Sequence, residues 1–385
     1  MREGWTYKKL GEVCEVVSGS TPKTNVPEFW GNGHYWITPA EIDDATVYIN
    51  KTERQITDAA IDKTHLQLLP IGTVLLSSRA PIGKVAITDT EMYCNQGFKN
   101  CICSDAIYNK FLFYFLKYKK NYLNSLGRGA TFKEISKSIV EKVAIPLPPL
   151  SEQQSIVAEL DKINELISLK KAQLSDLDSL AQSIFYDMFG DPIVNEKGWE
   201  VKKLGEVTEP TIGLTYKPDN VTSDGTGTIV LRSSNIQDSK LDFEDVVRVN
   251  MLIKDNKYVK DGDILMCSRN GSFRLVGKVA MIHALSERMS YGAFMTIIRS
   301  EYNPYLFGYF KTSAFREYLI QGKTTTVNQI TVQMLKEIKL PIPPLSLQQE
   351  FAKRIELIEQ QKAQISSTIK DLETLLASRM QYWFD

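Results

Sequence analysis

Apolar side chains recur at helical spacing in two long stretches of the chain. In residues 151–190 they follow one another at steps of three and four positions, with a break at Lys170. Residues 346–385 repeat the pattern, with breaks at Lys362 and Arg379. This spacing is the a/d seam of a coiled coil, and a helix with such a seam must bury it against a partner. The pattern therefore predicts two long helices that pack on each other.

Pro-Pro pairs precede both stretches, and a Ser follows each pair. Proline disfavours helix in the residue before it, and Ser is a preferred N-cap residue. Three residues after each Ser stands a Gln, which is the spacing of a capping box. The predicted caps are Ser151 with Gln154 and Ser346 with Gln349.

The orientation of the two helices follows from the chain between them. A globular segment returns the chain from the end of the first helix to the start of the second, which favours an antiparallel pair. Two interpretations of Lys170 and Lys362 stay open: they set the register of the pair, or they extend outward into water.

The segments before the helices show a different pattern. Short β-like runs such as Thr73–Leu76 and Lys84–Ile87 alternate with turn residues, and a helical stretch follows near residues 108–123. The second copy has its helical stretch near residues 305–319. We therefore expect an α+β fold for both globular segments.

The sequence contains two copies of this arrangement of a globular segment followed by a long helix. Gly4–Val13 recurs as Gly198–Val207, and Gly72–Arg79 matches Gly262–Arg269 in the same order. A repeat of this length indicates duplicated domains rather than a solenoid. The predicted organisation has four parts: a domain at 1–150, a helix at 151–190, a domain at 191–345 and a helix at 346–385.

Composition narrows the class of protein. The chain has 385 residues, with 46 Lys and Arg against 46 Asp and Glu, so any basic surface must be local. Five Cys without framework spacing argue against a disulfide scaffold, and we expect no metal site and a cytoplasmic location. Apolar runs fall far short of the roughly 20 residues of a membrane helix, and we expect no membrane association. Phosphate-loop, dinucleotide, zinc-protease and nucleophile-elbow motifs are absent from the sequence, so we predict no catalytic residues.

Charge is distributed unevenly within each copy. Residues 99–142 carry nine basic against three acidic side chains, and residues 299–339 carry six against three. Residues 151–189 are acidic, with seven acids against three Lys. This distribution suits contact of the domains with phosphate and contact of the helices with protein.

Candidate DNA contacts lie in loops that combine hydroxyl-bearing, small and basic residues. Arg79 and Arg269 each follow a β-like run, and they can either reach a base edge or form an internal salt bridge. Small residues and one basic side chain near 127–131, and again near 322–326, suit close approach to a phosphate backbone. The predicted DNA-binding residues are Ser20, Thr21, Lys23, Arg79, Lys84, Arg128, Thr131, Arg269, Lys278, Lys323, Thr324 and Thr326.

Both copies open with W-x-x-x-x-L-G-E and close with P-x-P-P-L-x-x-Q-Q before a long helix. Together with the stretch from Gly19–Pro22 to Trp36–Ile42, this pattern resembles the specificity subunit of type I restriction–modification systems over essentially the whole chain. The second copy departs from it where residues 210–213 replace the Gly-Ser-Thr-Pro loop.

The resemblance implies two target-recognition domains, each reading one half of a split, asymmetric site in double-stranded DNA. It implies an antiparallel coiled coil that sets the distance between the halves. Two modification (methyltransferase) subunits would dock on the helices, and restriction subunits (ATP-dependent endonucleases) would join them. The chain would be non-catalytic and bind no cofactor, with S-adenosylmethionine bound by the modification subunits.

Two other classes of protein remain open at this point. One is a non-catalytic two-domain scaffold on a coiled coil that binds protein or carbohydrate. The other is a self-contained methyltransferase, for which the sequence lacks a cofactor loop.

Overall fold

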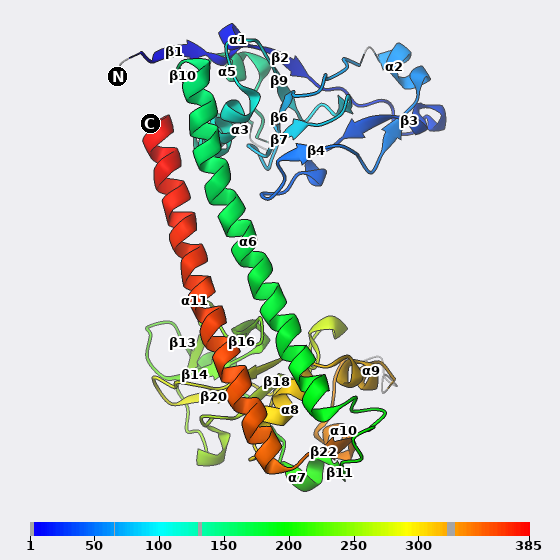
Figure 1. Ribbon diagram of the computed structural model, residues 1–385, viewed down its shortest axis with the longest axis vertical. Helices are drawn as coiled ribbons and strands as arrows, with labels where there is room; N and C mark the ends of the chain where they lie inside the picture. Colours follow the sequence, from blue (N-terminus) through cyan, green and yellow to red (C-terminus); the bar gives the residue numbers. More distant parts are fainter. Residues whose placement is uncertain (1–3, 65, 130–132, 322–327) are drawn as a thin grey trace. The chain divides into compact units, whose positions relative to one another are not determined.

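The computed structural model describes residues 4–64, 66–129, 133–321 and 328–385. The chain forms two compact units. The first comprises Met1–Lys171 and Ser367–Asp385, and the second comprises Ala172–Ser366. Each unit therefore contains one globular domain and a part of both long helices, α6 (Leu150–Phe189) and α11 (Leu345–Phe384) (Figure 1).

The first unit combines three sheets with five short α-helices in the described part of the chain. Its main sheet has the strand order β2-β9-β6-β7-β4, a smaller sheet has the order β5-β3-β8, and β1 pairs with β10. The strands are β1 (Thr6–Lys9), β2 (Cys14–Ser18), β3 (Trp30–Ile37), β4 (Tyr48–Ile49), β5 (Gln55–Ile56), β6 (Val74–Leu76), β7 (Val85–Thr88), β8 (Tyr93–Cys94), β9 (Lys99–Cys103) and β10 (Ala144–Leu147). The short helices are α1 (Leu10–Val13), α2 (Asp58–Thr64), α3 (Asn109–Tyr118), α4 (Lys120–Ser125) and α5 (Lys137–Glu141). Helix α3 covers β6 and β7, and its central residues are fully buried.

The second unit repeats this plan with altered sheets. Two four-stranded sheets have the orders β12-β21-β18-β19 and β13-β17-β14-β20, and the pairs β15-β16 and β11-β22 complete it. The strands are β11 (Glu200–Lys203), β12 (Thr211–Ile212), β13 (Val221–Thr222), β14 (Thr228–Leu231), β15 (Ile236–Gln237), β16 (Lys240–Leu241), β17 (Val247–Val249), β18 (Ile264–Cys267), β19 (Val279–Met281), β20 (Met289–Tyr291), β21 (Met295–Ile298) and β22 (Lys339–Ile342). The short helices are α7 (Leu204–Val207), α8 (Asn303–Phe310), α9 (Ser313–Gln321) and α10 (Val332–Glu337). The predicted α+β class is thus confirmed.

In the first unit, the start of α6 packs against the end of α11. The Arg379 guanidinium bonds both carboxylate oxygens of Glu159, and the Lys171 ammonium lies 3.0 Å from the Glu373 carboxylate. Residue numbers rise along α6 while they fall along α11, so the helices are antiparallel, as the sequence predicts. The last turn of α11 enters the core of the domain, where Phe384 is buried.

In the second unit, the end of α6 packs against the start of α11, again antiparallel. Phe185 and Phe189 contact Phe351 with ring centroids 5.8 and 5.1 Å apart. Lys362 is buried in the seam, and its ammonium lies 2.7 Å from the Asp178 carboxylate across the pair. The Lys362 side chain therefore points into the helix pair and does not extend into water. In this position it favours one register of the pair.

The predicted caps of the long helices are wrong. Both helices begin one residue before the predicted cap, at Leu150 and Leu345, so Ser151 and Ser346 already lie in the first turn. The carbonyl of Pro149 accepts the N–H groups of Glu152 and Gln153 at 2.9 and 3.0 Å, which are the first bonds of the helix. The glutamine that reaches back is Gln153, which donates to the carbonyl of Pro148, rather than Gln154.

Each predicted helical stretch after the sheet is broken into two helices. The first breaks at Lys119, whose backbone leaves the helical region at ψ 11°. The second breaks at Lys311 and Thr312, and the Thr312 hydroxyl accepts the N–H of Phe315 at the start of α9. Within the described ranges, none of the helices is both long enough and apolar enough to cross a membrane.

Candidate nucleic-acid interface

The loop after β2 lies close to the backbone of Cys94 and Asn95. The N–H of Ser20 donates to the carbonyl of Cys94 at 3.0 Å. A Cβ on Gly19 would lie only 1.9 Å from the Asn95 carbonyl oxygen, so glycine alone allows this approach. Thr21 is half-buried and Lys23 is exposed. The loop thus presents Ser20, Thr21 and Lys23, three of the predicted contacts, on a fixed backbone.

Arg79 belongs to an ion-pair cluster that is centred on Glu134. The Arg79 Nε donates to Glu134 Oε2 at 3.0 Å, and the Lys99 ammonium lies 3.4 Å from the other Glu134 oxygen. Burial alone would raise the pKa of the Glu134 carboxyl, but the hydrogen bonds and charges of Arg79 and Lys99 outweigh it and hold the pKa below its usual range. Of the two roles open for Arg79, the geometry favours the internal salt bridge.

Backbone bonds bring the remaining loops of the first unit to the same place. The N–H of Ser78 donates to the Gly97 carbonyl at 2.7 Å, and Arg128 and Glu134 exchange both backbone bonds at 3.0 Å. The Lys84 ammonium donates to the Pro39 carbonyl at 2.8 Å. Ser20, Arg79, Lys84 and Arg128 therefore belong to one contiguous loop cluster, which we call the first loop cluster.

Arg128 differs from the other basic residues of the first loop cluster. Its side chain is exposed, and among the described residues no side-chain partner is seen for it. An exposed cation without an internal acid partner is free to contact phosphate, whereas Arg79 is already neutralised by Glu134.

The second unit builds an equivalent cluster from different residues. The N–H groups of Ser268 and Arg269 donate to the Phe294 carbonyl at 2.9 and 3.1 Å, and the N–H of Ile330 donates to the Ser268 carbonyl at 2.8 Å. The Arg269 guanidinium lies 5.2 Å from the centre of the exposed Phe294 ring. The Lys278 ammonium bonds the Gln237 amide oxygen at 3.4 Å. These residues form the second loop cluster.

The divergent loop at residues 210–213 occupies the place of the Gly-Ser-Thr-Pro loop. Its Leu214 N–H donates to the Tyr291 carbonyl at 2.8 Å, as Ser20 does to Cys94. A Cβ on Gly213 would lie 2.2 Å from the Gly292 carbonyl oxygen. The tight backbone approach is thus shared by both units although the sequences differ.

Four predicted contacts lie outside the described residues: Thr131, Lys323, Thr324 and Thr326. Sequence reasoning missed two members of the first loop cluster, Lys99 and Glu134. Glu134 stands 55 positions from Arg79, and no periodicity links residues so far apart. The role of every predicted contact in DNA binding stays a prediction.

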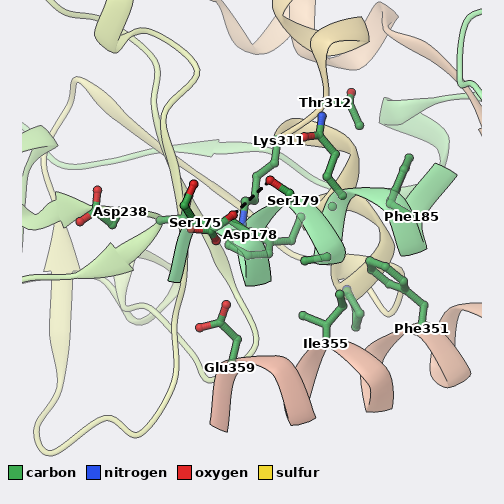
Figure 2. Close-up of a pocket in the computed structure, with 16 residues that line it drawn as sticks. Ser175, Asp178, Ser179, Phe185, Asp238, Lys311, Thr312, Phe351, Ile355 and Glu359 are labelled. Carbon is green, nitrogen blue, oxygen red and sulfur yellow. Dashed lines mark hydrogen bonds between the residues drawn. The ribbon is translucent and has the colours of Figure 1, made fainter. Parts of the chain in front are cut away.

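The second unit also contains a pocket of about 370 Å³ between α6, α8 and α11 (Figure 2). Its aromatic wall includes Phe185 and Phe351, and charged groups lie at its rim. Burial lowers the pKa of the Lys311 ammonium there. The Glu359 carboxylate lies 2.9 Å from the Lys240 ammonium and 3.0 Å from that of Lys362. Glu359 of this pocket therefore ties α11 to the strand β16, and Asp178 ties α6 to Lys362 of α11, which suits a structural role.

Duplicated α+β domains, each with basic side chains beside a loop whose close backbone approach requires glycine, define the class of two-domain recognition proteins. The family model described as the type I restriction modification DNA specificity domain matches residues 2–178 and again 196–374. The chain belongs to this family.

Two relatives and one solved structure illustrate the similarity. The chain is 39% identical over 227 residues to the type I restriction enzyme MjaIX specificity subunit of Methanocaldococcus jannaschii, covering 54% of this chain and 52% of the relative. It is 25% identical over 406 residues to the MjaVIII specificity subunit of the same organism, covering 97% and 92%. A chain from a structural study of complex assembly in the type I R-M system matches with a TM-score of 0.65 at 21% identity, covering 99% and 97%, and shows the shared fold.

The chain therefore aligns with about half the length of the MjaIX subunit and with most of the MjaVIII subunit. The names of these relatives describe specificity subunits of restriction enzymes.

Proposed function

We propose that this chain is the sequence-specific DNA-recognition subunit of a type I restriction–modification complex. Each globular domain reads one half of a bipartite, asymmetric target in double-stranded DNA. The observation that carries the proposal is the repetition of the loop cluster in both units: the backbone bonds match, but Arg79 contacts Glu134 whereas the equivalent Arg269 contacts Phe294. Equivalent backbone positions with different surrounding side chains suit two domains that read different sequences.

The chain itself is non-catalytic in this proposal, and chemistry belongs to its partners. Two modification subunits dock on the helices and bind S-adenosylmethionine, and restriction subunits join them. Large apolar side chains on the outward faces of the helices support docking: Leu166, Leu169 and Leu375 are exposed in the first unit, and Leu180 and Leu357 in the second. Exposed apolar side chains of this kind gain free energy when a protein partner covers them. Genomic DNA as the target implies a cytoplasmic location.

Methylome sequencing tests the proposal directly. Cells that carry this gene with its partner modification gene are compared with cells from which this gene alone is deleted. We expect one bipartite methyladenine motif to disappear on deletion. Persistence of every motif would refute the recognition role. Binding of the purified chain to a protein or sugar, insensitive to salt and without binding to DNA, would instead establish the scaffold alternative.

A further inference from the structure

The first unit holds an arginine that neither the sequence motifs nor the loop cluster accounts for. The guanidinium of Arg54, between β4 and β5, lies 3.7 Å from the centre of the Trp30 ring and 5.4 Å from that of Trp36. The two indoles meet edge to face, with centroids 5.0 Å apart and an interplanar angle of 82°. Trp30, the nearer ring, is half-buried and packs against Trp36, which is buried, so the support beneath the guanidinium is anchored in the domain's interior.

The same two tryptophans hold the loop after β2. The indole N–H of Trp36 donates to the Ser20 carbonyl at 3.1 Å, and that of Trp30 donates to the Lys23 carbonyl at 3.2 Å. The backbone of Arg54 is fixed as well, because its carbonyl accepts the N–H of Trp36 at 3.2 Å. Arg54 and the Ser20–Lys23 loop are therefore two parts of one rigid assembly.

Stacking leaves the hydrogen-bonding capacity of Arg54 intact. The five N–H donors of a guanidinium lie in its plane, whereas the indole covers its face. Arg54 is exposed, and within the described ranges no carboxylate or carbonyl is bonded to its side chain. Arg288 shows the contrast: it stacks 3.8 Å from the Tyr258 ring centre, but its Nη2 lies 2.8 Å from the Asp255 carboxylate.

A planar donor fork that is immobilised, exposed and unneutralised has a specific use at a DNA surface. Arginine bonds O6 and N7 of guanine with two parallel hydrogen bonds, and this is the commonest specific contact in the major groove. Holding the fork in place beforehand reduces the side-chain entropy lost on binding. Lysine replaces it poorly here, because an ammonium on a flexible stem has no planar donor group to stack on the Trp30 ring, and is therefore not held in a fixed orientation.

We propose that Arg54, held on Trp30 and Trp36, is a specificity-determining residue that reads a guanine in the half-site of the first domain. The inference rests on the proposed DNA-recognition function and adds to it a residue and the base that this residue selects.

The test uses the full chain expressed with its modification partner. Methylome sequencing is performed for the wild type, for Arg54→Lys and for Arg54→Ala. The purified complexes are then titrated with duplexes that carry each base at every position of both half-sites. We expect both variants to lose discrimination for guanine at one position of one half-site by roughly 5- to 150-fold, the range of a bidentate pair. The other half-site and the spacer stay unchanged.

Arg288→Lys is the matched control, because it alters a stacked arginine that an acid already neutralises. We expect it to leave both half-sites unchanged, and thermal unfolding checks that all variants fold. Unaltered base preference in folded Arg54→Lys, or a uniform loss of affinity for all sequences, would overturn the assignment of Arg54 while the recognition function stands. A wild-type chain that directs no bipartite motif would overturn the function itself, and Arg54 with it.

Discussion

Replacement of Phe384 by Ala tests whether the end of α11 belongs to the core of the first unit. Phe384 is 2% exposed, and its ring lies 5.3 Å from that of Phe111 and 5.8 Å from that of Phe115, measured between centroids. All three side chains belong to one buried cluster of the first unit.

The expected cost is large because a well-packed ring is removed. Phe-to-Ala changes in protein cores cost about 3–5 kcal/mol, through lost burial and the cavity that remains. Domains are stable by only about 5–15 kcal/mol, so the loss is a large share of the total. With a urea m-value of about 3 kcal/mol per M, the unfolding midpoint of the first unit falls by about 1–1.7 M.

Urea titration followed by tryptophan fluorescence and by circular dichroism measures this change. Trp383 stacks on Trp5 with ring centroids 6.2 Å apart, so fluorescence reports on this part of the unit. The control is Leu375→Ala on the same helix, where the side chain is 45% exposed and the expected change is within about 0.5 kcal/mol. A change below about 1 kcal/mol for Phe384→Ala would show that the end of α11 does not support the first unit in solution.

Four further predictions concern the loops and helices. Arg128→Ala, and likewise Lys323→Ala, weakens binding to all sequences and lowers the salt slope by about one unit; altered base preference alone would contradict the phosphate role. Gly19→Ala destabilises the chain by at least about 1–3 kcal/mol in thermal unfolding because its Cβ would strike backbone, whereas Gly271→Ala, with open space around its Cβ, is tolerated. The hydrogen bond from Arg379 lowers the pKa of Glu159, so the wild type is more stable than Glu159→Gln above about pH 4.3, and this difference disappears on acidification. Melting temperatures of both proteins are measured against pH, and curves that do not converge at low pH refute the prediction. Insertion of one heptad into both long helices changes the spacer of the methylated motif but not its half-sites, which methylome sequencing reads directly.

The long helices were predictable because their signal is local. A seam at steps of three and four is visible in the chain itself, and two such seams imply their pairing. The caps were not predictable in the same way, because the proline carbonyl and the buried Gln153 compete with Ser151 for the role. The entry of Phe384 into the first core was also hidden, since its partner Phe111 stands far away in the sequence.

The candidate site was predictable only in outline. The repeat located the loops that contain Arg79 and Arg269, but it said nothing of their neighbours. Glu134, which neutralises Arg79, is brought to it by backbone pairing between distant loops. Arg54 has no equivalent signal in either repeat, and only the fold shows that two tryptophans support it.

The first unit is built from two separate segments of the chain, and this affects how truncated genes are interpreted. A premature stop codon late in the reading frame removes Ser367–Asp385, which belongs to the first unit. The lesion lies downstream of the second domain, yet it removes Met380 and Phe384 from the hydrophobic interior of the first. A truncated allele that loses recognition is therefore no proof that the missing residues touched DNA. Fragments intended to isolate the first domain need this segment supplied, either as a fused tail or as a separate peptide.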